Sequence, residues 1–335
     1  MKGLLLIAAA SAAFGLGCAK KAAPAATTAP QGATVVANPA PAAEAVPAPE
    51  KMPRVKDAAV YVDGRIVAFL KPYELPASVH AQRSSKNERP YGFASYLTAI
   101  GVDVSKVRQL HLHGGTIGGF TTIIPGDSLR VARDDIRFVF SADGKGRPRP
   151  DFNGRSRSTL GINTGVDTIN AVAVYIEKEP PHENAEYGLS YPDGRKVDGM
   201  AYADAEAGAG TRVYVDGKLV SIVKRKSLSN DLLATGDLAK PEFSLAAYLK
   251  SVGVDPSKAT VADFIDGDGP RARVPAARLQ TLTFAVPARN QGLAVMALDG
   301  APEEKITAIQ LYRSQVAPKR ETSPSPASVQ KTHQG

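Results

Sequence analysis

The fold of this chain is decided by a stretch that occurs twice, Val60-Tyr61-Val62-Asp63-Gly64-Arg65-Ile66-Val67 and Val213-Tyr214-Val215-Asp216-Gly217-Lys218-Leu219-Val220. In each copy, two runs of β-branched and aromatic residues flank an Asp-Gly pair. An Asp-Gly pair between such runs is the strongest short signal for a β-hairpin. The sequence therefore predicts a hairpin near the start of each of two related segments.

The similarity between the two segments continues beyond the hairpin. Residues between Ala94 and Lys106 recur in order, and at one constant offset, between Ala246 and Lys258, and residues 169–175 recur as 306–312. Solenoid repeats have periods of about 20–50 residues, so this much longer period indicates tandem domains. We expect two homologous domains, residues 55–180 and 211–315, joined by a linker at residues 181–210.

Each domain is expected to be α+β and mostly strand. Residues 93–100 carry apolar side chains at helical spacing and end at Gly101, a suitable left-handed cap, and Ser244 is a suitable N-cap for the second helix. Tyr96 and Tyr248 lie on the apolar helix faces and are predicted to be core. Further strands are predicted at residues 107–113, 120–124, 136–140 and 171–176. Each domain should thus contain a hairpin, one well-defined helix and a mixed or antiparallel sheet.

The order of these elements resembles a known family. The chain has a Val-Asp-Gly-Lys hairpin, a Ser-Leu-x-x-Tyr-Leu-Lys-x-x-Gly-Val helix, a strand pair, a basic loop and a terminal Ile-x-x-Ile strand. This order resembles a shortened oxidoreductase molybdopterin-binding domain of the sulfite-oxidase type. That family holds molybdenum through a cysteine thiolate, and the only cysteine here, Cys18, lies far from either domain. The resemblance therefore implies a domain that has lost its metal ligand, and no catalytic residue is carried over.

Composition limits the possible classes of protein. The 335 residues are 43% hydrophobic, carry a formal net charge of +8 and include one Cys. This content suffices for a packed core in each of two domains. A single thiol excludes an internal disulfide framework, a Cys-based zinc finger and a cysteine-ligated iron–sulfur cluster.

The N-terminus predicts export. Residues 1–17 consist of a short positive region followed by a small and apolar run that is too short to span a bilayer, as in a secretory signal. With Gly17-Cys18 they resemble a bacterial lipoprotein signal, which implies that Cys18 is acylated and anchors the protein. An ordinary signal peptide with an incidental cysteine is the alternative. Ala19 is not the Asp that retains enterobacterial lipoproteins in the inner membrane, so the resemblance favours the outer membrane.

Both ends of the exported chain are predicted to be unfolded. Residues 18–54 are rich in Ala and Pro. Proline has no backbone N–H to donate, and the segment has few bulky side chains to bury. It is therefore predicted to be the lipid anchor and a tether. Residues 316–335 are polar and contain Pro, and are predicted to be a disordered tail.

Three groups of residues could form a site. His111 and His113 form His-x-His, which places two imidazoles on one strand face, as in some metal sites. The alternative is a partly exposed polar strand face. Asp263, Asp266 and Asp268 could gather oxygen ligands for a calcium site, or form a polar turn. Five cations are close in sequence and could bind an anion, or form a solvated loop: Lys145, Arg147, Arg149, Arg155 and Arg157.

The sequence favours a non-catalytic function. It contains no nucleophile elbow, P-loop, dinucleotide fingerprint or His-Glu-x-x-His motif. We therefore expect a binding or assembly module of the cell envelope, with no cofactor, whose partner is an anionic glycan, a lipid or an acidic protein. The export signal argues against nucleic acid. The alternative function is a metal-dependent or degenerate molybdopterin-type periplasmic oxidoreductase.

Overall fold

The two Asp-Gly pairs form the turns of two β-hairpins, as the sequence predicts. In the computed structural model, strands β1 (Ala58–Val62) and β2 (Arg65–Leu70) pair antiparallel, and so do β12 (Thr211–Val215) and β13 (Lys218–Val223). Asp63 and Gly64 have φ values of 47° and 84°, and those of Asp216 and Gly217 are 48° and 81°. Glycine adopts this left-handed conformation without strain, and Asp tolerates it better than most residues.

The structure describes residues 57–318 except 83–87, 115–120, 142–145, 163–164, 184–188, 191–195, 198–209, 236–237, 268, 288–291 and 299–302. The signal peptide, the tether and the tail after residue 318 lie outside the described residues. Both hairpins belong to one compact unit, Pro47–Gly335. We call residues 57–180 the first half and residues 211–318 the second half.

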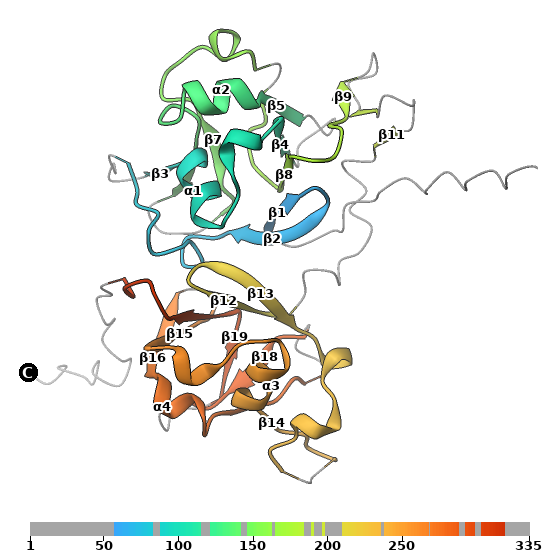
Figure 1. Ribbon diagram of the computed structural model, residues 1–335, viewed down its shortest axis with the longest axis vertical. Helices are drawn as coiled ribbons and strands as arrows, with labels where there is room; N and C mark the ends of the chain where they lie inside the picture. Colours follow the sequence, from blue (N-terminus) through green and yellow to red (C-terminus); the bar gives the residue numbers. More distant parts are fainter. Residues whose placement is uncertain are drawn as a thin grey trace, which may run out of the picture. The chain divides into compact units, whose positions relative to one another are not determined.

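The first half is built on a mixed five-stranded sheet. The strand order is β2-β1-β8-β4-β5, with β1 parallel to β8 and the other pairs antiparallel. Two helices and a smaller sheet, β3-β6-β7, cover one face of this sheet (Figure 1). The other elements are β3 (Glu88–Gly92), α1 (Phe93–Ala99), η1 (Val104–Lys106), β4 (Gln109–His113), β5 (Thr121–Pro125), α2 (Gly126–Val131), β6 (Arg137–Ser141), β7 (Arg149–Asp151), η2 (Ser158–Leu160) and β8 (Ala171–Tyr175).

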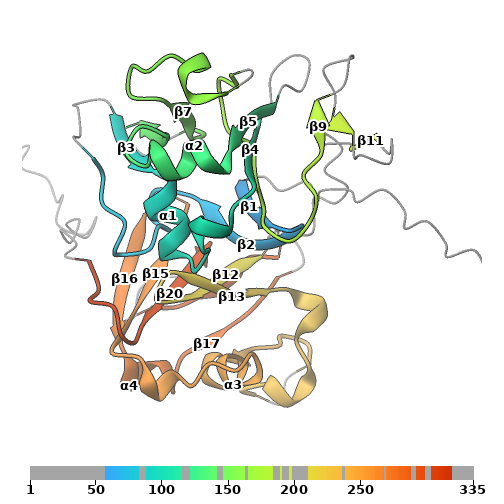
Figure 2. The same ribbon diagram turned by 45° about the horizontal axis from the view of Figure 1, so that its top comes forward.

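The second half has a five-stranded sheet of the same arrangement. Its order is β13-β12-β20-β15-β16, and β12 runs parallel to β20. Helices α3 and α4 lie on one side of it (Figure 2). The other elements are η3 (Arg225–Ser227), η4 (Asn230–Leu232), β14 (Phe243–Ser244), α3 (Leu245–Ser251), η5 (Pro256–Lys258), β15 (Val261–Ile265), β16 (Pro270–Pro275), α4 (Ala276–Leu279), β17 (Thr283–Phe284), β18 (Ala294–Met296), β19 (Glu304–Ile306) and β20 (Ala308–Tyr312).

The structure is α+β and mostly sheet, with two corrections to the sequence-based expectation. Each half contains a second short helix, α2 or α4, where one helix per domain was expected; these helices are too short to show a helical period. The segment expected to be a linker contains a three-stranded sheet of β9 (His182–Glu183), β10 (Leu189–Ser190) and β11 (Lys196–Val197).

Local predictions about the longer helices hold. The Ser244 side chain caps α3 by accepting a hydrogen bond from the backbone N–H of Ala247 at 3.2 Å. Tyr96 and Tyr248 are buried in the cores of their halves. These features depend on residues close in sequence, which explains why the sequence suffices to locate them.

Each hairpin turn is held by its aspartate. Asp63 Oδ1 accepts hydrogen bonds from the backbone N–H groups of Ile176 and Lys178 at 3.0 and 3.1 Å. Asp216 Oδ1 likewise accepts hydrogen bonds from the chain that follows β20, and the first of these comes from the backbone N–H of Arg313 at 2.9 Å. Burial alone would raise the pKa of both carboxyls, but these N–H donors outweigh it and lower the pKa of each below 3.8.

Candidate functional site

The face of the first sheet that its helices leave uncovered is apolar near β1, β2 and β8. Alternate residues of these strands form a buried cluster that includes Tyr61, Phe69 and Tyr175. Leu219 and Ile222 of β13 pack against this cluster. The two halves therefore contact each other directly, and we call this contact region the junction.

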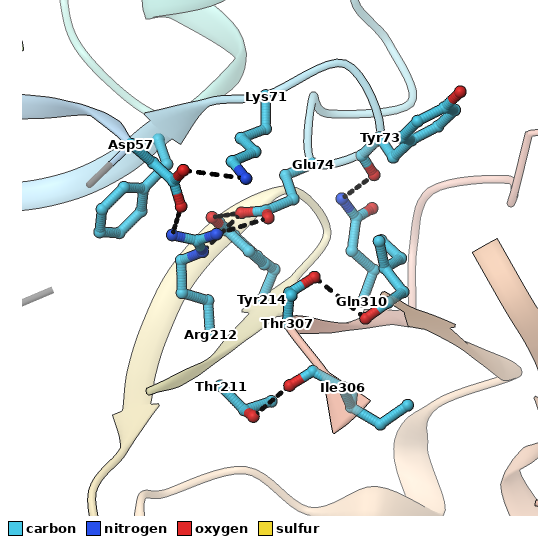
Figure 3. Close-up of polar contacts among 12 residues, drawn as sticks. Asp57, Lys71, Tyr73, Glu74, Thr211, Arg212, Tyr214, Ile306, Thr307 and Gln310 are labelled. Atoms are coloured by element: carbon cyan, nitrogen blue, oxygen red, sulfur yellow. Dashed lines mark hydrogen bonds and ion pairs between the residues drawn. The ribbon is translucent and has the colours of Figure 1, made fainter. Parts of the chain in front are cut away.

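A buried ion network crosses the junction (Figure 3). Arg212 of β12 places Nη2 at 2.9 Å from Glu74 Oε1 and Nε at 2.8 Å from Glu74 Oε2. Its Nη1 donates to Asp57 Oδ2 at 2.7 Å, and Asp57 also pairs with Lys71 at 2.9 Å. Arg212 and Glu74 are each only 3% exposed. The planar guanidinium thus bridges two carboxylates, an arrangement that Lys could not reproduce.

The surroundings complete this network. Tyr214 Oη donates to Glu74 Oε2 at 2.6 Å, and the Arg212 guanidinium lies 4.3 Å from the ring centre of Phe69. Burial alone would raise the pKa of Asp57, but the charges of Arg212 and Lys71 lower it below 3.8. Burial, followed by the charge of Glu74, raises the pKa of Tyr214 well above 10, so its hydroxyl stays a donor.

The loop at residues 72–80 follows β2 and is held by the second half. Gln310 Nε2 donates to the carbonyl oxygen of Tyr73 at 3.2 Å. A Cβ on Gly217, in the turn between β12 and β13, would lie 2.5 Å from Cβ of Pro76. Glycine is therefore needed at 217 both for its positive φ and for this close approach.

A groove with a volume of about 1210 Å³ runs beside this loop, and we call it the junction groove. Its walls come from loop 72–80 and β3 of the first half, and from residues 269–271 and 315–318 of the second half. The lining residues are Pro72, Tyr73, Leu75, Pro76, Ala77, Ser78, Val79, His80, Arg89, Tyr91, Gly269, Pro270, Arg271, Gln315, Val316, Ala317 and Pro318. In the described part of the chain, none of these is a carboxylate.

Two arginines give the junction groove a positive wall. Arg89 is exposed on β3, and its guanidinium has no ion pair or hydrogen bond with any residue that the structure describes. Arg271 pairs with Asp266 and lies 3.7 Å from Glu304. No described residue therefore neutralises the charge of Arg89, whereas Arg271 shares its charge with two carboxylates.

A smaller pocket of about 250 Å³ lies at the other side of Tyr73. It is lined by Lys71 and Arg147, but also by Asp57, Glu74 and Asp266. Because charges of both signs line it and Lys71, Asp57 and Glu74 already bind one another or Arg212, this pocket is a weaker candidate for an anion than the junction groove.

The basic loop predicted to bind anions is dispersed. Arg147 lines the small pocket, Arg149 pairs with Glu88, Arg155 pairs with Asp135 at 2.8 Å, and the Arg157 guanidinium lies against Gly165. Lys145 lies outside the described residues. The structure therefore does not gather these cations at one place, and two of the arginines have carboxylate partners within the chain.

His111 and His113 are buried, which corrects the expectation of a partly exposed strand face. Both side chains are at most 1% exposed, and β4 lies between β8 and β5 in the first sheet. His111 Nε2 bonds Gln109 Oε1 at 2.8 Å, and His113 Nδ1 bonds Thr121 Oγ1 at 3.2 Å. His111 Nδ1 and His113 Nε2 have no partner in the described structure.

The neighbouring strands do not complete a metal site around these imidazoles. The cross-strand partners of His111 are Ile123 and Ala173, and those of His113 are Thr121 and Ala171. Among the described residues, no three His, Cys, Asp or Glu side chains form a possible metal group. Metal binding by His111 and His113 stays a prediction from sequence.

The acidic segment considered for calcium uses its carboxylates within the chain. Asp263 is fully buried and accepts hydrogen bonds from Arg273 at 2.7 and 2.9 Å. Asp266 pairs with Arg271 and accepts from the Gly269 N–H at 2.9 Å. Asp263 is thus a buried carboxylate on β15 that pairs with the exposed Arg273, where a polar turn was the expectation. Asp268 lies outside the described residues.

Arg89, Arg212 and Glu74 are the functional candidates that the sequence reading missed. One signal was present: Arg212 stands where the first copy of the repeat has Ala59, inside an otherwise apolar strand. A charge at such a position indicates a buried partner elsewhere in the chain. Nothing in the local sequence of Arg89 marks it.

Comparison with known protein families, curated proteins and solved structures finds no match to this chain. No helix within the described ranges is sufficiently long and apolar to cross a membrane.

Proposed function

We propose that this chain is a non-catalytic binding module of the cell envelope that holds an anionic ligand in the junction groove. The single observation that carries this proposal is the lining of the groove, which has two arginines and, among the described residues, no carboxylate. The volume of about 1210 Å³ exceeds the roughly 300–1,000 Å³ of pockets for small molecules. The groove thus suits a polymer better than a metabolite.

Binding fits the chemistry of the junction better than catalysis does. Arg212, Glu74 and Tyr214 are ionisable groups buried there, and they bind one another. A general base or nucleophile must instead be within reach of a substrate. These residues are better suited to fixing the two walls of the groove.

We infer that the two halves arose by duplication of one domain. The sequence repeat, the common strand order of the two five-stranded sheets and the matching roles of Asp63 and Asp216 support this inference. On this view the groove is formed where the two copies meet, so neither copy has it alone.

We further propose that export and acylation at Cys18 anchor the module, at the outer membrane. Cells expressing the chain and given an alkyne-bearing palmitate analogue should yield labelled protein, and the Cys18→Ala variant should lose the label. In-gel fluorescence after immunoprecipitation measures this. Equal labelling of both chains, or an unlabelled wild-type chain, would contradict lipidation at Cys18.

Charge reversal at Arg89 should weaken anion binding. Fluorescein-labelled poly-glutamate, a labelled glutamate–tyrosine copolymer and labelled alginate are titrated against the full-length protein in a nonionic detergent, with fluorescence anisotropy as the readout. We expect at least one polyanion to bind, more weakly as salt rises, and Arg89→Glu to weaken that binding about tenfold because it exchanges attraction for repulsion.

The matched control is Arg65→Glu. Arg65 is also exposed and belongs to the same half, but it does not line the groove. This variant has the same net charge as Arg89→Glu, so it should bind like the wild type. If the two variants lose affinity equally, or if no polyanion binds the wild-type protein, the proposed function is wrong.

A further inference from the structure

The apolar part of the junction groove indicates which class of anion it takes. About half of its exposed lining is apolar: the described residues include four prolines, and Leu75, Val79 and Val316. The phenol rings of Tyr73 and Tyr91 add aromatic surface. Apolar walls of this kind bury apolar side chains of a ligand.

The hydrogen-bonding side chains of the groove belong to seven of its seventeen described lining residues: Tyr73, Ser78, His80, Arg89, Tyr91, Arg271 and Gln315. Proline provides no backbone N–H donor. Among the described lining residues, Gln315 is the only carboxamide and there is no carboxylate. A sugar chain presents hydroxyl groups on every residue, and those placed against the prolines, Leu75 and the valines would be left unpaired. An acidic glycan therefore matches the charge and the polar half of the lining, but not its apolar half.

The lining of the groove also includes an exposed hydrophobic residue, Val316. Val316 is 88% exposed. Arg89 stands on the opposite half of the molecule but lines the same groove. A ligand that carries both a carboxylate and apolar side chains would satisfy both features at once.

Resting on the proposed function, we propose that the junction groove binds an extended acidic peptide segment of a partner protein, one that also carries aromatic or aliphatic side chains. A carboxylate of the segment would pair with Arg89 in the bidentate geometry that guanidinium allows. Its apolar side chains would lie against the prolines and tyrosines. The segment would be extended, since an extended chain can reach lining residues of both halves.

The test compares three labelled probes on the full-length protein: the glutamate–tyrosine copolymer, poly-glutamate and alginate. We expect the copolymer to bind about tenfold more tightly than either of the others, because only it combines carboxylates with aromatic rings. Val316→Ser should weaken copolymer binding about threefold and leave poly-glutamate binding unchanged.

Val131→Ser is the matched control, since Val131 is also 88% exposed and lies on α2, outside the groove. It should bind the copolymer like the wild type. If alginate or poly-glutamate binds as tightly as the copolymer, the peptide assignment is overturned while anion binding in the groove stands. If no probe binds, both the assignment and the proposed function fail.

Discussion

Arg212→Ala is expected to lower the free energy of unfolding by about 3–5 kcal/mol. The guanidinium of Arg212 is the direct cationic partner of Glu74, which is only 3% exposed. Without Arg212 the Glu74 carboxylate would stay in a low-dielectric environment with Tyr214 as its neighbour, and an uncompensated buried charge is strongly destabilising. Urea denaturation followed by circular dichroism measures the loss, since the chain has no Trp to serve as a fluorescent probe.

Arg149→Ala is the control for this result. Arg149 also pairs with a carboxylate, that of Glu88, but both side chains are about half exposed, at 53% and 47%. Pairs in contact with solvent contribute about 0–1 kcal/mol, so this variant should stay close to the wild type. A loss at Arg212 no larger than that at Arg149 would contradict the role of Arg212 as the buried partner of Glu74.

The double variant Arg212→Met and Glu74→Met separates the lost charge balance from the lost packing. Replacing both partners by apolar side chains of similar length removes the buried charge together with its counterion. We expect the double variant to be more stable than Arg212→Ala. Equal destabilisation would instead mean that Arg212 acts mainly through its contact with Phe69.

The parts of the fold that the sequence predicts are local. The Asp63-Gly64 turn, the Ser244 cap and the apolar face of α1 each depend on residues within a few positions of one another. A hydrogen bond such as that from Arg212 to Glu74 joins residues 138 positions apart. Spacing carries no information on such a pair, so the junction could not be read from the sequence.

The histidines show a second reason for the limits of sequence reading. The pattern of Gln109, His111 and His113 alternating with leucines is that of a strand with one polar face. Whether that face meets water depends on which strands flank β4 and what covers the sheet, and both are set by segments far away in the chain. Strand order places β4 between β8 and β5, and the polar face is buried.

For a related reason, the basic loop was not a good predictor of the proposed anion site. The sequence shows positive charges close together, but not the carboxylates that reach them from Glu88 and Asp135. Arg89 lies next to Glu88 and has no such partner among the described residues. A free charge is a property of the folded chain, and it cannot be predicted from the density of charges in the sequence.

The burial of His113 is expected to make the protein less stable as the pH falls from about 6.5 to about 4. Burial lowers the pKa of His113 from 6.5 to about 4. Above pH 6.5 the imidazole is neutral in both states and its contribution is constant. Below pH 6.5 the unfolded chain binds a proton that the folded chain does not, so stability falls until the folded imidazole also titrates, near pH 4.

The size of this loss of stability follows from the shift in the pKa of His113. About 2.5 pH units at 1.36 kcal/mol per unit give a loss of roughly 3 kcal/mol from His113. His111 acts in the same direction, because burial, and then the charge of a protonated His113, lower its pKa well below 6.5. Asp57 and Asp63, whose pKa values are lowered, lose their stabilisation only below pH 3.8, outside this window.

Unfolding free energies measured between pH 7 and pH 4 test this expectation. In His113→Gln, the amide can still bond Thr121 Oγ1 but cannot take up a proton, so the decline with pH should be about 3 kcal/mol shallower than in the wild type. Asp63→Asn is the control: it removes an acceptor of backbone hydrogen bonds and should lower stability by the same amount throughout this range, leaving the decline unchanged. If His113→Gln and the wild type decline in parallel, then the imidazole of His113 is protonated as readily in the folded protein as in the unfolded chain, and its burial beside Ala171 does not exclude the charge.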